Sequence, residues 1–230
     1  MSVLATGAVF SVVARKLTLV AGLGAFVVGL GIYLGDGYTG LLLLAAFFLL
    51  ATLATAHGKQ LKAKLTAQSV HPERRTLGQV LANGGVAALL GLLAFFFPVH
   101  KELYALLLAA ALASATADSL ASELGMVYGR NAFNILTGKK EERGLDGVIS
   151  LEGTLLGMAG SLIIALIYAA GHGIDLSLGI IIVAGTLGNL ADSVLGASLE
   201  RKHYLNNDLV NALNTLVAAM AAFLMYLLLY

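Results

Sequence analysis

Cysteine is absent from this sequence, so the chain forms no disulfide and offers no thiolate ligand or nucleophile. Charge is scarce as well, because Asp, Glu, Lys and Arg make up only 12% of the 230 residues. Soluble domains have about 25%, and a soluble fold of this composition could not cover its surface. The small net charge of +1 gives no indication of a nucleic-acid partner.

Long apolar runs take the place of the missing charge. Hydrophobic residues make up 59% of the chain, and the mean hydropathy of +0.89 excludes a water-soluble globule or a disordered chain. A helix of about 20 residues crosses the ~30 Å hydrocarbon layer of a membrane, and the runs lack the alternation of a membrane β-barrel. Seven stretches are long enough or nearly so: 17–35, 41–56, 78–97, 103–125, 148–170, 177–199 and 208–229.

The sequence therefore predicts an all-α fold, a polytopic transmembrane helix bundle that forms a single domain over 1–230. We expect seven full spans and a short N-terminal segment, 2–14, which is only about 20 Å long as a helix. That segment is a tilted, truncated, half-inserted or crossing helix, which gives six to eight crossings in all. A homo-oligomer is compatible with this pattern but has no support in it.

The basic residues predict the orientation in the membrane. Alternate connecting segments contain 13 of the 14 Lys and Arg residues, and the other connections contain only Lys101. By the positive-inside rule, the basic segments face the cytoplasm. We expect an integral protein of a prokaryotic inner membrane, with its functional side at the cytoplasmic face. The basic segments are 15–16, 57–77, 126–147 and 201–202.

Polar side chains gather at the cytoplasmic ends of five predicted helices, whereas the outer halves of these helices are nearly featureless. Ionisable groups inside membrane segments are costly, which makes them functional-site candidates. Ser114, Asp118 and Ser122 share one helical face. The other helices contribute Gln79, Asn83, Ser150, Glu152, Thr154, Asn189, Asp192, Ser193, Gly196, Glu200, Asn207, Asp208, Asn211 and Asn214.

Asp118 and Asp192 are the strongest candidates, because the helices supply no cation to pair with either carboxylate. Two carboxylates with Ser and Asn oxygens form a hard oxygen site suited to Mg²⁺. Their spacing leaves open whether the two side chains meet. Both occur in an Ala-Asp-Ser context, which is compatible with a weak internal repeat.

Simpler roles are favoured for other polar residues. Ser and Thr side chains commonly hydrogen-bond between membrane helices, and this role is expected for Ser114, Ser161, Ser198 and Thr215. The histidines lie in loops or at segment ends without the spacing of metal ligands, which favours interfacial positions for His57, His71, His100, His172 and His203.

The connection 126–147 carries charge of the opposite sign. Lys139, Lys140 and Arg143 lie among glycines, and Ser150 and Thr154 follow at the start of a helix. Glycines and a helix N-terminus favour a phosphate, but a solvated charge run that ends in a helix cap explains the pattern equally well. The phosphate-loop consensus GxxxxGK[ST] is absent.

Five motifs occur in an order that resembles the DUF92 membrane family, also called the TMEM19-like or phytyl-phosphate kinase family. They begin at Gln79, Ala117, Gly144, Asp192 and Asn206. In the third motif, where the family has Gly-Thr-x-Gly-Gly, this chain loses one glycine and gains the carboxylate of Asp146. The plant and cyanobacterial members convert a prenyl monophosphate to the diphosphate with a nucleoside triphosphate.

The resemblance implies a Mg²⁺-dependent prenyl-phosphate kinase that uses CTP or ATP, with CTP favoured, and a phytyl- or geranylgeranyl-phosphate-like acceptor in the lipid bilayer. Asp118 and Asp192 would hold Mg²⁺, with Glu123 assisting, while Lys139 and Arg143 would stabilise the transferring group. The residues implied to bind substrate are Asn83, Ser119, Ser122, Thr137, Lys140, Gly144, Gly147, Ser150, Thr154, Asn189, Ser193, Glu200, Asn207 and Asn211.

Two other functions remain open. A CTP-using cytidylyltransferase-type lipid enzyme needs the same metal and phosphate groups. A small transporter would use the repeated Ala-Asp-Ser motif as the mark of two pseudo-symmetric halves, although both acids lie near one face on helices that run the same way. A purely structural scaffold does not explain the clustered acids.

Overall fold

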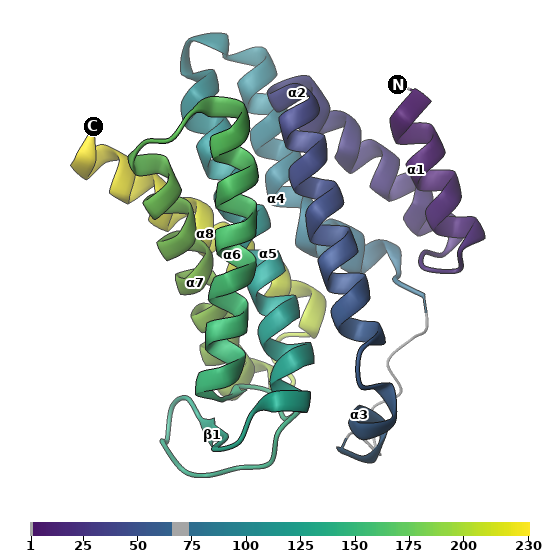
Figure 1. The fold of residues 1–230 in the computed structure, drawn as a ribbon, viewed down its shortest axis with the longest axis vertical. Coiled ribbons are helices and arrows are strands. Elements are labelled where there is room, and N and C mark those ends of the chain that lie inside the picture. The colour runs from purple at the N-terminus through teal and green to yellow at the C-terminus, as the bar shows by residue number, and fades with distance from the viewer. Residues whose placement is uncertain (1, 66–73) are drawn as a thin grey trace.

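Helix α5 (Lys101–Tyr128) occupies the centre of a helical bundle and packs against the five other long helices that the structure describes. The structure is a computed structural model that describes residues 2–65 and 74–230 (Figure 1). Small side chains, many of them alanines, line the middle of α5 and are buried. They let the neighbouring helices approach closely, as is usual for helix packing in membranes. The neighbours are α2 (Leu19–Ala56), α4 (Leu77–Phe96), α6 (Leu151–His172), α7 (Leu176–Leu195) and α8 (Asn207–Leu229).

Helix α2 is a hairpin of two helical limbs. A straight helix of its 38 residues would be about 57 Å long, but Gly37 breaks it with φ 60° and ψ −138°, a backbone conformation that favours glycine. A Cβ placed on Gly29 would lie 3.5 Å from Leu44, so the limbs 19–36 and 38–56 run side by side. Figure 1 shows the two limbs meeting at the top of the bundle.

The structure confirms the all-α membrane bundle predicted from the sequence. Among the described residues, six helices are long and apolar enough to cross a membrane. The two limbs of α2 correspond to the predicted segments 17–35 and 41–56. The short helix α1 (Ser2–Val13) lies against the first limb of α2, and none of its residues is buried. Helix α3 (Lys59–Leu65) follows the second limb. The predicted interfacial residue His71 lies outside the described residues.

Two predicted spans have different ends in the structure. The segment 148–170 begins as a strand, because β2 (Val148–Ile149) pairs antiparallel with β1 (Phe133–Asn134) before α6 starts. Ser150 is the N-cap of α6, and its side chain accepts a hydrogen bond from the backbone N–H of Gly153. Helix α7 ends at Leu195 and continues as the π-helix η2 (Gly196–Glu200). A short 3₁₀ helix, η1 (Pro98–His100), precedes α5.

The end of the bundle where α2 breaks at Gly37 also contains interacting polar side chains, which lie just beyond the predicted apolar segments. His172 Nε2 lies 2.8 Å from Asp36 Oδ1, and its Nδ1 lies 3.1 Å from Glu102 Oε2. The imidazole also stacks on Tyr168, with 4.3 Å between ring centroids. His172, for which an interfacial position is predicted, therefore joins α2, α5 and α6.

Candidate functional site

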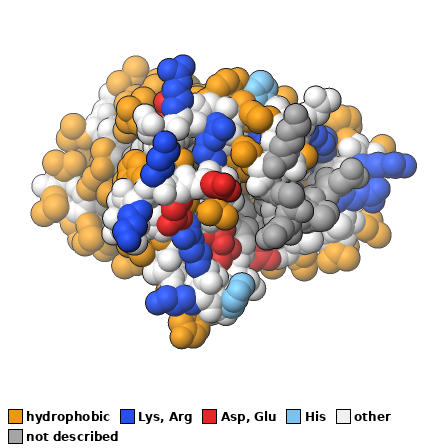
Figure 2. All heavy atoms as spheres, turned by 90° about the horizontal axis from the view of Figure 1, so that it is seen from below, with side chains coloured by type: hydrophobic (Ala, Val, Ile, Leu, Met, Phe, Trp, Pro, Cys, Tyr) orange, Lys and Arg blue, Asp and Glu red, His pale blue; other side chains and the backbone are white. Residues whose placement is uncertain are grey.

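A polar cavity of about 300 Å³ opens at the end of the bundle where the 129–150 connection lies. Figure 2 shows this end of the molecule, where acidic side chains lie among Lys and Arg. The cavity brings together residues from both halves of the sequence. The predicted site residues that line it are Asn83, Asp118, Ser119, Ser122, Glu123, Arg143, Gly144, Gly147, Ser150, Thr154, Asn189, Asp192, Ser193, Glu200, Asn207 and Asn211. Their individual roles remain predictions.

The carboxyl groups of Asp118 and Asp192 meet in the wall of this cavity. They lie within hydrogen-bonding reach of each other, which answers the question that the spacing left open. Among the described residues, no Lys, Arg or His forms an ion pair with either of them. Two adjacent carboxylates without a cation partner fit a divalent cation that substrate phosphates and water complete.

A buried amide holds one member of this pair. Asn214 Nδ2 donates to Asp192 Oδ2 at 2.7 Å, and its Oδ1 accepts from Ser114 Oγ at 3.1 Å. Asn214 has no exposed surface. Helices α5, α7 and α8 are therefore joined directly beneath the acid pair.

Two further acids increase the negative charge of the cavity. Asp146 and Glu200 line it, and Asp146 lies close enough to Asp192 and Glu200 to act on both electrostatically. The described residues of the lining include five carboxylates and two guanidinium groups. Among the described residues, however, no three His, Cys, Asp or Glu side chains form a complete metal site. The donor set fits a cation that arrives with phosphate better than one bound by protein alone.

Arg201 fixes the connection that contains Asp146. Its Nε donates to the Asp146 carbonyl at 2.6 Å, and its Nη2 lies 2.6 Å from Glu141 Oε2. The hydrogen bond from Arg201 lowers the pKa of Glu141. Gly147 then packs directly on η2, where an added Cβ would overlap Ala197.

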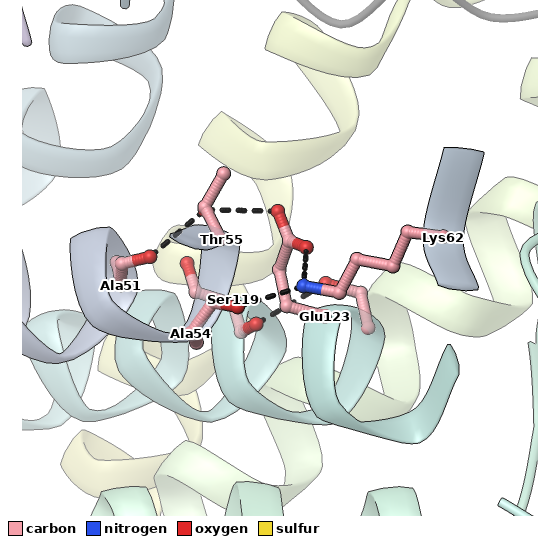
Figure 3. Close-up of polar contacts among 7 residues, drawn as sticks. Ala51, Ala54, Thr55, Lys62, Ser119 and Glu123 are labelled. Atoms are coloured by element: carbon pink, nitrogen blue, oxygen red, sulfur yellow. Dashed lines mark hydrogen bonds and ion pairs between the residues drawn. The ribbon is translucent and has the colours of Figure 1, made fainter. Parts of the chain in front are cut away.

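Glu123 lines the cavity, but both of its carboxylate oxygens already have protein partners (Figure 3). Oε2 lies 2.6 Å from Lys62 Nζ in α3, and Oε1 accepts from Thr55 Oγ1 at 2.9 Å. Lys62 also donates to the Ala54 carbonyl at 2.7 Å. These contacts favour a positioning role for Glu123, in which it anchors α3 to α5, over the metal-assisting role that the resemblance implies.

Three residues predicted for the site lie outside the cavity. Thr137, Lys139 and Lys140 are exposed at the tip of the β1–β2 connection and do not line it. The Asn134 side chain closes this turn by accepting from the N–H groups of Leu136 and Thr137. Arg143 does line the cavity, and its guanidinium donates to the carbonyl of Gly129 at 2.7 Å.

Arg75 and Thr55 are lining residues that the sequence analysis did not assign to the site. The position of Arg75 in the basic segment 57–77 predicts only a role in membrane orientation. Its guanidinium lies 5.7 Å from the ring centroids of Phe47 and Phe48, and burial lowers its pKa. The sequence feature that could have indicated a place in the site is the position of Arg75, one residue before the capping box at the start of α4.

The residues assigned to helix packing divide into two groups. Ser114 bonds to Asn214 of α8, and Ser161 Oγ donates to the Ala113 carbonyl of α5 at 3.4 Å, which confirms their contacts between helices. Ser198 and Thr215 instead donate to carbonyls of their own helical segments. For these two residues the predicted contact between helices is wrong.

Comparison with known proteins agrees with the resemblance. A family model described as "Integral membrane protein DUF92" matches residues 2–219. The uncharacterized membrane protein MJ0933 of Methanocaldococcus jannaschii is 35% identical over 205 residues, which cover 89% of this chain and 83% of the relative. The uncharacterized membrane protein sll0875 of Synechocystis sp. is 33% identical over 222 residues, with coverages of 94% and 85%.

A plant protein is also similar. Protein VTE6, chloroplastic, of Arabidopsis thaliana is 31% identical over 214 residues, which cover 87% of this chain and 62% of that protein. No solved structure matches the chain.

Proposed function

The chain belongs to the DUF92 family of integral membrane proteins, and from this premise we propose that it is a Mg²⁺-dependent prenyl-phosphate kinase. It transfers a phosphoryl group from a nucleoside triphosphate, with CTP favoured, to an isoprenyl monophosphate such as phytyl or geranylgeranyl phosphate. The site faces the cytoplasm, and the protein lies in a prokaryotic inner membrane. The activity and the donor follow from the resemblance that the sequence motifs indicate.

The observation that supports this proposal most directly is the contact between Asp118 and Asp192 in a polar cavity. These carboxylates would hold Mg²⁺, which when bound neutralises charge on the donor phosphates. Asp146 and Glu200 add to the negative potential that attracts the cation. Asn83, Asn207 and Asn211 also line the cavity and would donate hydrogen bonds to phosphate oxygens.

The proposed reaction requires the protein to position the two substrates and does not require it to transfer a proton. An oxygen of the acceptor phosphate forms a bond to the γ-phosphorus of the donor, the bond from that phosphorus to the β–γ bridging oxygen breaks, and the nucleoside diphosphate leaves. The attacking oxygen is already anionic, so no general base is needed. Arg143 in the cavity wall would stabilise the transferring group.

The testing experiment measures label transfer from γ-labelled CTP or ATP to phytyl, geranylgeranyl or farnesyl phosphate by the purified protein, with Mg²⁺ or with EDTA. We expect transfer only with Mg²⁺. Asp118→Asn and Asp192→Asn should each lower the rate about a hundredfold or more, because each removes charge that holds the donor complex. Asp208→Asn is the matched control, since Asp208 lies at the same end of the bundle but does not line the cavity.

The products separate the remaining functions. Released nucleoside diphosphate supports a kinase, whereas pyrophosphate together with a nucleotide-linked lipid would identify a cytidylyltransferase. Substrate flux into liposomes without nucleotide would identify a transporter. Parent-level transfer by a variant with both aspartates replaced would overturn the metal assignment.

A further inference from the structure

A second cavity, of about 240 Å³, lies beside the polar one and is almost entirely apolar. Helix α1, both limbs of α2 and the start of α4 form its walls. Leu4 comes from α1, Val28 and Phe47 come from the two limbs of α2, and Val80 comes from α4. Helix α1 buries none of its own residues but closes one side of this apolar pocket.

Two residues line both cavities, Arg75 and Gln79. Arg75 is the charged residue of the apolar pocket among the described residues, and its guanidinium stacks over Phe47 and Phe48. None of the described residues forms an ion pair or hydrogen bond with that guanidinium. Glu123 acts on it electrostatically, but the oxygens of Glu123 are held by Thr55 and Lys62.

This arrangement matches a ligand with one apolar chain and an anionic head. The apolar walls favour a hydrocarbon chain at roughly 25 cal/mol per Å² of buried surface. A guanidinium with unused donors favours a phosphate, which it can bind with two hydrogen bonds. Arg75 lies between the apolar pocket and the polar cavity, and the acid pair lies in the wall of the polar cavity. A phosphate bound at Arg75 would therefore face the position proposed for the donor.

We propose that the apolar pocket binds the isoprenoid chain of the acceptor and that Arg75 binds its phosphate, with Gln79 beside it at the junction. The proposal rests on the proposed function for the identity of the acceptor. It assigns α1 and the first limb of α2 to substrate binding. It also assigns acceptor recognition to a residue that the basic segment 57–77 had suggested to be topological.

The test is a binding measurement with labelled farnesyl monophosphate and the full chain in detergent, without nucleotide or Mg²⁺. Gly7 lines the apolar pocket, and a Cβ there has open space. Gly7→Phe should fill the pocket and weaken binding about tenfold or more. Gly179→Phe is the matched control, because Gly179 is also a helical glycine with open space but lines neither cavity.

The head and the chain are tested separately. Arg75→Leu should weaken binding of farnesyl monophosphate about tenfold or more, because it removes a charged hydrogen-bond donor, and should leave binding of farnesol unchanged. Gly7→Phe should weaken binding of both ligands. Equal affinity in the Gly7→Phe and Gly179→Phe variants, or equal loss of farnesol and farnesyl monophosphate in Arg75→Leu, would overturn the proposal.

A labelling experiment covers the case in which Gly7→Phe does not fold. Because the chain has no cysteine, Ala8→Cys creates a single thiol in the lining of the pocket. Farnesyl monophosphate should slow its reaction with a maleimide, and it should not slow the reaction of Gly179→Cys. Equal protection of Ala8→Cys by dioleoyl phosphatidic acid would show a general lipid site instead and contradict the proposal.

The outcome is independent of catalysis. Binding that follows this pattern in a protein without phosphoryl transfer would leave the pocket assignment standing and refute only the kinase. If the protein transfers phosphoryl groups but Gly7→Phe does not weaken binding, the kinase assignment would stand and the pocket assignment would be refuted.

Discussion

Asn214 is the residue through which the helices beneath the acid pair are joined. It is fully buried, donates to Asp192 and accepts from Ser114. An amide that satisfies both of its neighbours fixes the direction in which the Asp192 carboxylate points. Residues that orient a metal-binding carboxylate in this way affect activity without touching substrate.

If Asp192 holds Mg²⁺ as proposed, replacement of Asn214 should change the Mg²⁺ dependence of the activity more than it changes the stability of the fold. We expect Asn214→Leu to lower transfer activity about tenfold to a hundredfold and to raise the Mg²⁺ concentration that gives half-maximal rate. The measurement is a Mg²⁺ titration of the transfer assay. Thr215→Val is the control, because Thr215 is equally buried but bonds only within its own helix; an equal effect in both variants would assign Asn214 to packing alone.

For individual residues, the sequence predicted the acidic side chains of the site but not the side chains that hold them in position. Asp118 and Asp192 stand out because a carboxylate within an apolar membrane segment is energetically costly and therefore indicates a functional site. Asn214 shares its helical face with Asn207 and Asn211, and nothing in that spacing shows which amide meets a carboxylate. The partner of Glu123 was hidden for the same reason, because Lys62 is 61 residues away in a segment that also carries topological charge.

The connection between α5 and α6 is the element on which the shape of the polar cavity depends most. β1 pairs with β2 over only two residues each, and Arg201 and Ala197 hold the returning strand from the η2 side. Gly147 has φ +70° and no room for a Cβ, whereas Gly138 at the exposed tip has φ +66° and open space. The two glycines share a backbone conformation and differ in their surroundings.

This pair allows backbone strain to be separated from close approach. Gly138→Ala should lower the free energy of unfolding by about 1–2 kcal/mol, the usual effect of a left-handed conformation. Gly147→Ala should lower it further and also reduce transfer activity, because the strand must move away from Ala197. Thermal unfolding in detergent and the transfer assay give both numbers. Equal losses in the two variants would mean that contact with η2 is unimportant.

The direction of this connection could not be predicted from its composition. Lys139, Lys140 and Arg143 are close in sequence, yet only Arg143 reaches the cavity. The difference comes from the turn closed by Asn134, which places both lysines at the tip. The spans themselves were predictable because hydropathy and length decide them. Their ends were less predictable, because residues 148–149 pair as β2 and α6 begins only at Leu151, after its N-cap Ser150.

At the scale of the whole molecule, the two ends of the bundle differ in how their polar side chains are arranged. The polar cavity opens at one end, while at the opposite end His172 bridges Asp36 and Glu102. Asp36 is 6% exposed, and its Oδ2 has no hydrogen-bond partner among the described residues. A buried carboxylate with one partner depends strongly on that partner.

Loss of this tie should destabilise the bundle as a whole. His172→Phe keeps a ring against Tyr168 but leaves Asp36 without its partner, and we expect the free energy of unfolding to fall by about 3–5 kcal/mol. The double variant Asp36→Leu/His172→Phe should recover much of the loss, because it removes the isolated charge. Thermal unfolding in detergent compares the two, and a double variant as unstable as the single one would contradict the account.

The contacts of His172 with Asp36 and Glu102 could not be predicted from the sequence, because the three residues are far apart in the chain and none of them belongs to a motif. Asp36 and His172 are separated by 136 residues, and each lies at the end of an apolar segment, where polar residues are expected at the membrane interface. The bundle and the cluster of acids at one end of it follow from patterns within single segments, and these patterns also predict the orientation. Contacts between segment ends require the packing of the helices.

The break at Gly37 has a consequence for sidedness. An uninterrupted α2 would traverse the membrane once where the hairpin traverses it twice, and every later helix would then be inverted with respect to the bilayer. If the protein lies in the membrane as proposed, the basic connections after residue 56 and the polar cavity would then face away from the cytoplasm. In the proposed kinase, the left-handed backbone at Gly37 therefore determines whether cytoplasmic nucleotide can reach the site, although Gly37 lines neither cavity.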